Sequence, residues 1–185
     1  WIFRLAYFDG NNLKKIKSIE NKDKFFVGTP HMESIAKYKS ENCKIILNTR
    51  IEKIFKKNDK WYLSDQDKKN YGDYDWIILS LPAEQSLQLI TQDISFYSLL
   101  KKIKMNGCIS LMIGMNEKLY LKYDAALIEN NDIGWLAVNN SKPCRKKNFS
   151  LLINSSYEYA SKNINSPTEE IIKHFFEQFK KLSAD

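Results

Sequence analysis

The chain has 185 residues, of which 43% are hydrophobic and 28% are charged, and its formal net charge is +7. This length allows one ordinary domain, or one and a half, with a real core. The apolar fraction excludes a disordered chain, and charges interrupt every apolar run before the roughly 18 residues that a membrane span requires.

The positive charge is spread along the chain rather than gathered in one basic segment. Only Arg4, Arg50 and Arg145 are arginines among the 29 basic residues, and the lysines occur in scattered pairs. Isoleucine outnumbers valine and asparagine is plentiful, a bias typical of an AT-rich genome. We therefore expect a solvated surface, with neither nucleic acid nor a membrane as partner.

The first part of the chain predicts short strands followed by a helix. Trp1–Lys24 contains an aromatic strand-like piece, a turn at Asp9–Asn12 and then an alternation of lysine and isoleucine. Phe25–Val27 is expected to form a brief strand. Apolar residues at helical spacing predict a helix over Met32–Tyr38, with Thr29 as its cap.

From residue 44 onward the hydrophobic pattern is typical of strands. Lys44–Asn48 is a compact apolar strand, and residues 51–74 then show period two in three stretches that turn-forming residues separate. This spacing predicts a three-stranded antiparallel meander. Trp76–Leu81 is an unbroken apolar run, which predicts a strand buried on both faces.

The second half predicts helices near Glu84–Ile90 and Phe96–Ile103, and then a sheet closed by a helix. Four more strands without long helices between them favour antiparallel pairing. These strands are Cys108–Met115, Ala125–Glu129, Gly134–Asn139 and Leu151–Tyr157. An amphipathic helix follows Pro167, and we interpret His174 in it as a packed or solvent-edge residue rather than a catalytic one. The predicted fold class is α+β: a meander segment plus a mostly antiparallel sheet with flanking helices.

Few residue patterns point to a particular chemistry. The six glycines form neither G-x-G-x-x-G nor G-x-x-x-x-G-K-[ST], and no G-x-S-x-G elbow is present. The three cysteines and two histidines lack metal-ligand spacing, so no metal site is expected. We interpret Cys43, Cys108 and Cys144 as buried free thiols of a protein in a reducing compartment, the cytoplasm.

Four segments in chain order carry the motifs of one known family. They are Phe26–Tyr38, Leu47–Ile54, Trp61–Leu63 with Tyr74–Gln85, and Gly134–Pro143. They resemble, in turn, the G-x-P-G-M, T-R-V, P-A-x-Q and S-S-K-P-G-R regions of renalase-like, amine-oxidase-like FAD-dependent oxidoreductases. The resemblance covers roughly residues 26–153. It implies a central fragment that lacks the N-terminal G-x-G-x-x-G and the C-terminal FAD segment.

The resemblance also implies a division of roles along the chain. Residues 1–90 would be a partial FAD-domain segment with the meander, and residues 91–185 the substrate domain. The positions implied to contact FAD are Arg50, Ile51, Leu81, Pro82 and Ala83. Those implied to bind substrate are Trp135, Asn139 and Lys142, through stacking, orientation by an amide and attraction of an anionic group.

The implied function of the whole protein is hydride transfer from an amine- or dihydronicotinamide-type substrate to FAD, and then to oxygen. Because the cofactor carries the electron chemistry, no catalytic side chain is expected. The isolated 185-residue chain is expected to bind no FAD, to be inactive and to self-associate through its truncated face. The alternatives are a stand-alone ligand- or protein-binding module, and a binder of single-stranded nucleic acid.

Overall fold

The computed structural model describes residues 1–20, 25–145 and 148–183 and shows the mixed α and β structure that the sequence predicts. The chain forms two compact units. The sheet unit contains residues 1–42 and 106–185, and the meander unit contains residues 43–105. The N-terminal strands thus belong with the second half of the chain. The division into a cofactor segment (1–90) and a substrate segment (91–185) concerns roles and stays a prediction.

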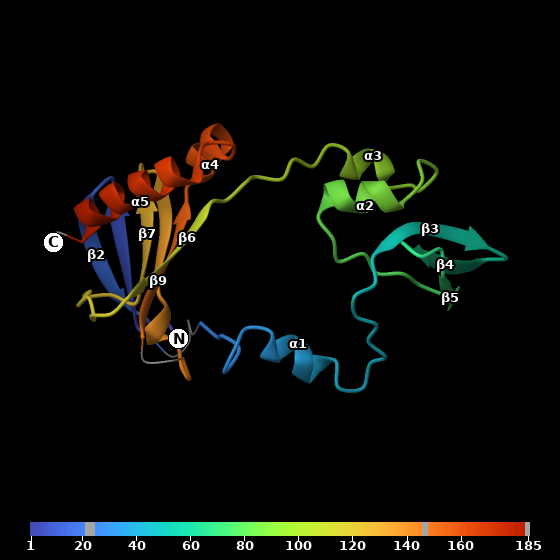
Figure 1. Ribbon diagram of the computed structural model, residues 1–185, viewed down its shortest axis with the longest axis horizontal. Helices are drawn as coiled ribbons and strands as arrows, with labels where there is room; N and C mark the ends of the chain where they lie inside the picture. Colours follow the sequence, from blue (N-terminus) through green and yellow to red (C-terminus); the bar gives the residue numbers. More distant parts are fainter. Residues whose placement is uncertain (21–24, 146–147, 184–185) are drawn as a thin grey trace. The chain divides into compact units, whose positions relative to one another are not determined.

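The sheet unit is built on six strands in the order β2-β1-β7-β8-β9-β6 (Figure 1). Neighbouring strands are antiparallel, as predicted for the second half, except that β1 and β7 are parallel with Leu5 opposite Ala125. The strands are β1 Arg4–Asp9, β2 Asn12–Ser18, β6 Ser110–Met115, β7 Ala125–Glu129, β8 Ile133–Val138 and β9 Phe149–Ser155.

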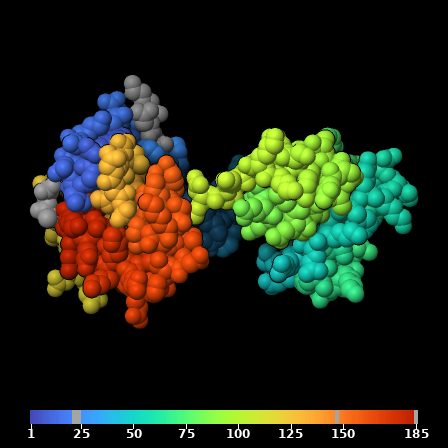
Figure 2. Space-filling model, turned by 90° about the horizontal axis from the view of Figure 1, so that it is seen from above, coloured from blue at the N-terminus to red at the C-terminus, as the bar shows by residue number. Residues whose placement is uncertain are grey.

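One face of this sheet forms the core of the unit because successive side chains of a strand alternate between faces. In β9, Leu151 and Ile153 are buried, and Leu136 in β8 is fully buried beside them. Helix α5, Thr168–Leu182, covers this face with Phe175, Phe179 and Leu182 (Figure 1). The N-terminal hairpin, the central strands and α5 form one continuous mass in the space-filling view (Figure 2).

Helix α5 begins and ends as predicted. It follows Pro167, carries Glu169 and Glu170 in its first turn and has Lys180 and Lys181 in its last turn, where these charges complement the helix dipole. The buried face is narrower than expected, because Ile172 and Phe176 are more than a third exposed.

A short helix that the sequence did not predict precedes α5. The strand expected over Leu151–Tyr157 ends at Ser155, and α4 occupies Tyr157–Asn163. The Ser156 side chain accepts a hydrogen bond from the Tyr159 N–H at 3.2 Å, a typical N-cap. A Ser-x-x-Tyr pattern after a strand carries only a weak signal for such a cap.

Asp124 joins the parallel strands at their start. Its buried carboxylate accepts hydrogen bonds from the Phe3 and Arg4 N–H groups at 3.1 and 2.9 Å, and the Arg4 guanidinium lies 3.3 Å away. The Asp124 N–H donates to the Arg4 carbonyl at 2.9 Å. The N-terminal hairpin is therefore attached to β7 by a charged residue as well as by the strand pairing.

His174 packs at the edge of the solvent, as predicted, with its side chain 31% exposed. Its ring stacks on Tyr159 with centroids 4.9 Å apart, and its Nε2 lies 2.8 Å from Oδ2 of Asp132. Both partners are in the sheet unit, so His174 connects α5 to α4 and to the turn between β7 and β8.

The meander unit contains the three-stranded antiparallel sheet that the sequence predicts. Its strands are β3 Ile51–Lys57, β4 Lys60–Asp65 and β5 Asn70–Tyr74, in the order β3-β4-β5. Asn58 and Asp59 have φ values of 50° and 60° in the two-residue turn between β3 and β4. Positive φ at both central positions is the preference of a type I′ hairpin, which asparagine and aspartate tolerate.

A buried carboxylate organises the second turn of the meander. Asp65 accepts hydrogen bonds from the N–H groups of Asp67 and Lys69, both at 2.9 Å, and from the Tyr71 hydroxyl at 2.8 Å. Burial alone would raise the pKa of Asp65, but these hydrogen bonds outweigh it and lower the pKa below its ordinary value. The hydrogen bond to Asp65 is also the main cause of a raised pKa at Tyr71.

Aromatic packing holds the middle of the meander. The Tyr62 ring stacks on Phe55 with centroids 5.5 Å apart and lies over Gly72 on the neighbouring strand. A Cβ atom at Gly72 would be 2.0 Å from Tyr62 Cδ1, so only glycine fits beneath this ring.

Two helices follow the meander near their predicted positions. They are α2, Ala83–Leu89, which packs against β3, and α3, Tyr97–Leu100. In the sheet unit, α1 spans Ser34–Lys39 inside the predicted helical region. Its N-cap is Glu33 rather than Thr29, so the predicted cap was wrong.

Three predicted strands are absent from the described residues. Residues 25–27, 44–48 and 76–81 have irregular backbone, and all three segments carry exposed apolar side chains. Trp76 is 86% exposed and Ile78 is 91% exposed, so the prediction that Trp76–Leu81 is a strand buried on both faces was wrong. An apolar run becomes a strand only when a neighbouring strand pairs with it, and no described strand lies beside these segments.

The cysteines also differ from the prediction. Cys43, Cys108 and Cys144 are free, as expected, but all three are exposed rather than buried. Cys108 belongs to an apolar run in the sequence, but β6 starts only at Ser110 and leaves Cys108 outside the core. Across residues 1–20, 25–145 and 148–183, no helix is both long and apolar enough to cross a bilayer.

Candidate functional site

The sheet-unit face that α5 does not cover is apolar and partly open. Strand pairing places two rows of side chains across it. One row is Leu5, Ala125, Ala137, Leu152 and Met112, and the other is Tyr7, Leu127, Trp135, Asn154 and Ser110. Parts of this face are exposed, since Met112 on the edge strand β6 is 81% and Leu127 on the interior strand β7 is 41% exposed. A surface of this kind can pack against a flat or apolar molecule.

Trp135, predicted to bind substrate, lies in the centre of this open face. Its partners across the sheet are Leu127 on β7 and Asn154 on β9. One part of its ring packs against the small cluster of Ile2, Leu5 and Ala125, and the residue remains partly exposed. The indole is thus held by the sheet on one side and is available for a contact on the other.

Lys142, the second predicted substrate residue, lies against an aromatic ring at the end of β8. A 3₁₀ turn, η2 Asn139–Ser141, leads to it. The Lys142 Nζ lies 4.6 Å from the centroid of the Trp1 ring, and the Trp1 Nε1–H donates to Ser141 Oγ at 2.8 Å. Burial lowers the pKa of Lys142, and the nearby charge of Arg145 lowers it further.

Asn139, the third predicted substrate residue, points into a different hollow. Its Nδ2–H donates to Ser150 Oγ at 3.2 Å, and the two residues line a cavity of about 570 Å³ together with Arg145 and His31. Trp135 and Lys142 are therefore brought near Trp1, whereas Asn139 lies at the ends of β6, β8 and β9. The three residues belong to one unit but do not form one cluster.

The predicted cofactor residues all lie in the meander unit. Ile51 is the first residue of β3, and Arg50 directly precedes it, with its backbone N–H and carbonyl both hydrogen-bonded to Gln66. The Arg50 N–H donates to Gln66 Oε1 at 2.7 Å, and its carbonyl accepts from the Gln66 N–H at 3.0 Å. The Arg50 side chain is exposed and forms no ion pair with a described residue, so its guanidinium remains available to an anion.

The other three predicted cofactor residues lie where the irregular apolar segment meets α2. Leu81 and Pro82 are exposed, and Pro82 is the N-cap residue of α2. Ala83 is buried, and the Leu81 carbonyl accepts a hydrogen bond from Ser86 Oγ at 3.3 Å. Because α2 packs against β3, these residues belong to the same small unit as Arg50 and Ile51.

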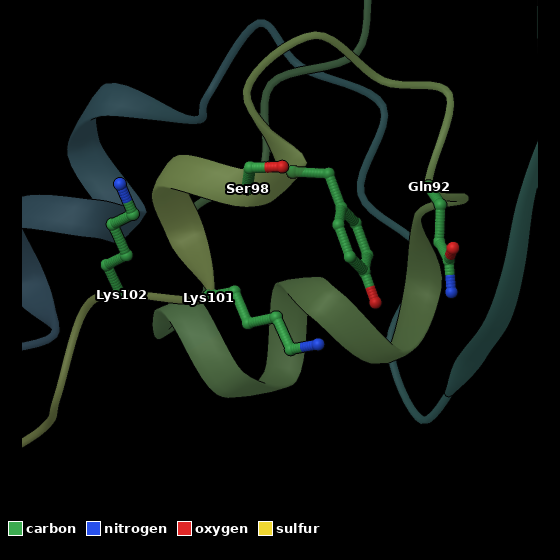
Figure 3. A pocket seen from close by; sticks show the side chains of 5 residues that line it. Gln92, Ser98, Lys101 and Lys102 are labelled. Atoms are coloured by element: carbon green, nitrogen blue, oxygen red, sulfur yellow. The ribbon is translucent and has the colours of Figure 1, made fainter.

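A second hollow, in the meander unit, was not predicted from the sequence. It has a volume of about 350 Å³ and is lined by Gln92, Tyr97, Ser98, Lys101 and Lys102 (Figure 3). The side chain of Lys101 lies between those of Lys102 and Gln92 in this view. The hollow is shallow and formed by one short helix and its flanking loop, so it contributes little to a site by itself.

Several residues at these positions were not predicted from the sequence. Trp1, Ser141 and Arg145 surround or approach Lys142, and Met112 and Tyr7 belong to the open face. The period-two pattern of each strand could have placed Met112 and Tyr7 on one face. The contact between Trp1 and Lys142 joins distant parts of the sequence and leaves no local signal. Within the described residues, no group of three or more His, Cys, Asp or Glu side chains is arranged to hold a metal ion.

Comparison with known proteins identifies the fold. No family model matches the chain. Solved structures with the same fold include a protein assigned as a protoporphyrinogen oxidase from Exiguobacterium sp. 255-15, at a TM-score of 0.60 and 14% identity, covering 83% of this chain and 35% of that one. A Pyrococcus furiosus protein matches at a TM-score of 0.57 and 13% identity, over 80% of this chain and 37% of that one.

A putrescine oxidase variant with redesigned cofactor binding also matches, at a TM-score of 0.57 and 10% identity, over 74% of this chain and 31% of that one. At these identities the likeness concerns the fold alone. The chain spans about a third of the length of each of the three structures.

Proposed function

We propose that this chain is the central part of an FAD-dependent oxidoreductase of the renalase-like or amine-oxidase-like kind. The observation that supports this most strongly is the fold, which is shared over 83% of the chain with a protein assigned as an oxidase. The motif resemblance over residues 26–153 points in the same direction. The whole protein would act on an amine- or dihydronicotinamide-type substrate in the cytoplasm.

The residues of the meander unit fit one side of a dinucleotide. Arg50 offers an exposed guanidinium, and Leu81 and Pro82 offer an exposed turn against which a planar or extended group can pack. The sequence has no glycine-rich loop to hold a pyrophosphate, so these residues supply only part of a binding site. FAD, when bound, supplies the acceptor for hydride removal and the route of the electrons to oxygen.

The sheet unit would contribute the substrate side. Trp135 would limit the position of the substrate by packing the exposed face of its ring against the substrate. The row of apolar side chains beside Trp135 would exclude water from the site. Lys142 would attract an anionic group of the substrate. Asn139 would orient a polar group through its amide. None of these residues is required to exchange a proton, which agrees with chemistry carried by the cofactor.

The proposal is tested by expressing the longest reading frame that contains this segment and recording the flavin spectrum of the purified protein. We expect stoichiometric flavin and substrate-dependent oxygen consumption. Arg50→Gln should lower the affinity for FAD about tenfold, which corresponds to about 1.4 kcal/mol. The matched control Lys57→Gln removes an exposed charge from β3, the strand that follows Arg50, and should change neither the affinity for FAD nor the oxygen consumption. A purified protein without flavin and without oxygen consumption would exclude the proposed function.

A second test separates the substrate side from the cofactor side. Trp135→Leu should raise KM about tenfold while the flavin content stays unchanged, because it removes a binding contact rather than a cofactor contact. Tyr120→Leu, which replaces an aromatic residue that is 84% exposed, is the control. The isolated 185-residue chain should bind no FAD, and tight stoichiometric binding in a titration would contradict that expectation.

The open sheet face also favours a second candidate function, a ligand- or protein-binding module without enzymatic activity. Met112 and Leu127 expose apolar surface there. We further propose that the isolated chain self-associates through exposed apolar segments such as Trp76–Leu81 and binds no nucleic acid. Sedimentation over a range of concentrations, with and without a single-stranded oligonucleotide, tests both expectations.

A further inference from the structure

The sheet unit contains a cavity whose lining, among the described residues, carries positive but no negative charge. It has a volume of about 570 Å³ and lies at the ends of β6, β8 and β9, next to the loop at Pro30 and His31. Its polar side chains are Arg145, His31, Asn116, Asn139, Asn148 and Ser150. No Asp or Glu is among the described residues that line it.

Arg145 is fixed in this cavity by backbone groups rather than by a carboxylate. Its Nη2–H donates to the Gly28 carbonyl at 3.1 Å, and its Nη1–H donates to the Pro30 carbonyl. The loop that supplies these carbonyls is tightly packed, since Gly28 is buried and a Cβ atom there would be 2.5 Å from the His31 carbonyl oxygen. The remaining N–H donors of the guanidinium fork form no hydrogen bond with a described residue.

The positive charge at this place is not neutralised nearby. Two backbone carbonyls satisfy hydrogen bonds but carry no net charge, and none of the ion pairs among described residues includes Arg145. Lys142 adds a second cation, and the charge of Arg145 contributes to the lowered pKa of that lysine. Two cations near each other without a carboxylate favour the binding of an anion.

We propose that this cavity binds the carboxylate or phosphate group of an organic ligand, with the Arg145 guanidinium as its main partner. A held guanidinium fork matches the two oxygens of such a group, and charge-assisted hydrogen bonds of this type are among the stronger ones. The amide of Asn139 and the hydroxyl of Ser150, 3.2 Å apart, add polar partners beside it. The volume lies within the roughly 300–1,000 Å³ of small-molecule sites, so it accommodates more than an inorganic anion.

This site belongs to the sheet unit alone. It shares Asn139 with the proposed substrate side, and Lys142 lies near it, so it deepens that part of the proposed function. It requires neither FAD nor any residue of the meander unit, so the anion is tested on the 185-residue chain without flavin, and its failure is distinguishable from a failure of the flavin and oxygen measurements.

The experiment is a titration of the ¹⁵N-labelled 185-residue chain with inorganic phosphate and, separately, with acetate, at constant ionic strength. NMR follows the Arg145 guanidinium and the backbone amides of Asn139 and Ser150. We expect saturable shifts with a Kd on the order of 1 mM. Arg145→Gln should weaken this binding at least tenfold. Lys173→Gln, which removes an equal charge from an exposed position of α5, should leave it unchanged.

The two probes distinguish the possible ligand groups. Saturation by both indicates a general site for oxyanions, and saturation by one alone assigns either phosphate or carboxylate chemistry. Shifts that never saturate, or that persist in Arg145→Gln, would mean nonspecific attraction by a basic chain and would overturn the proposal. If Arg145→Gln does not fold, Arg145→Lys keeps the charge but loses the fork. Its binding should be at least threefold weaker, and unchanged affinity would again overturn the proposal.

Discussion

The sheet unit and the meander unit use their apolar residues in opposite ways. In the sheet unit, residues such as Phe175, Leu136 and Ile153 are fully buried between α5 and one face of the sheet. In the meander unit, the only buried large apolar side chain among the described residues is Ile54, while Trp76 and Ile78 are almost fully exposed. The first unit has a continuous core, and the second relies on turns, hydrogen bonds and one aromatic stack.

The difference shows what holds a small sheet together when its core is thin. A three-stranded meander is marginally stable without further packing. Here Asp65 fixes one turn through three hydrogen bonds, and Tyr62 covers Gly72 and Phe55 on the neighbouring strands. We therefore expect the two units to respond to different kinds of substitution.

The largest expected effect concerns the core of the sheet unit. Phe175→Ala should destabilise this unit by about 3–5 kcal/mol, because it removes a fully buried ring and leaves a cavity under the sheet. Phe176→Ala, in which the replaced ring is 39% exposed, should cost about 1 kcal/mol or less. Urea unfolding monitored by NMR signals of Leu136 and Ile153 measures both. Equal losses in the two variants would show that α5 does not pack through Phe175.

The next effect concerns the aromatic stack of the meander unit. Gly72→Ala should destabilise this unit by about 1–3 kcal/mol, because the new Cβ atom displaces the Tyr62 ring from Phe55. Hydrogen exchange measured by NMR should show that the amides of β4 lose protection while those of β8 do not change.

Gly114→Ala is the matched control for Gly72→Ala. Gly114 is also a strand glycine, in β6, but a Cβ atom added there would meet no heavy atom within 4 Å beyond its chain neighbours, so alanine fits without displacement. Similar losses for both substitutions would mean that backbone freedom, rather than the ring, explains the cost at Gly72.

A smaller effect on the meander unit is expected from lowering the pH. The pKa of Asp65 is lowered below its ordinary value of 3.8, so its stabilisation is fully present above that pH and is lost as the pH falls through the lowered pKa. Protection of the Lys69 amide should therefore decrease as the pH falls below 3.8 and through the lowered pKa of Asp65. In Asp65→Asn this pH dependence should be absent. A profile that is unchanged in Asp65→Asn would assign the acid effect to another carboxylate.

The smallest effect should come from the exposed apolar segment. Ile78→Ser should change the stability of the 185-residue chain by less than about 0.5 kcal/mol, because this side chain is 91% exposed. Ile54→Ser, at a position that is 5% exposed, should destabilise the meander strongly. A large loss for Ile78→Ser, measured by the same unfolding experiment, would show that residue 78 packs against something.

Local patterns in the sequence predicted the elements that are stabilised locally. The alternation of apolar and polar residues with period two and the Asn58–Asp59 turn predicted the meander. The helical spacing of apolar residues and the charges at both ends predicted α5. The strand predicted at Trp76–Leu81 failed because a strand depends on a partner as well as on composition. The parallel pairing of β1 with β7 was missed for the same reason, since nothing near Leu5 in the sequence specifies Ala125.

The candidate site was predictable to a similar extent. The motif around Gly134–Pro143 drew attention to Trp135, Asn139 and Lys142, and the structure places them in one unit but in two separate surroundings. Arg145 and Trp1 were missed because their contacts are made across more than a hundred residues of sequence. Spacing along a chain cannot show contacts that depend on how strands are ordered in a sheet.

The pairing of β1 with β7 also determines the order in which the chain can be assembled. Arg4 and Asp124 are 120 residues apart in sequence, and the entire meander unit is synthesised between them. A growing chain therefore completes the meander, whose contacts are local, before the central strands of the larger unit exist. Until β7 emerges from the ribosome, β1 lacks the parallel partner with which it pairs in the folded sheet unit.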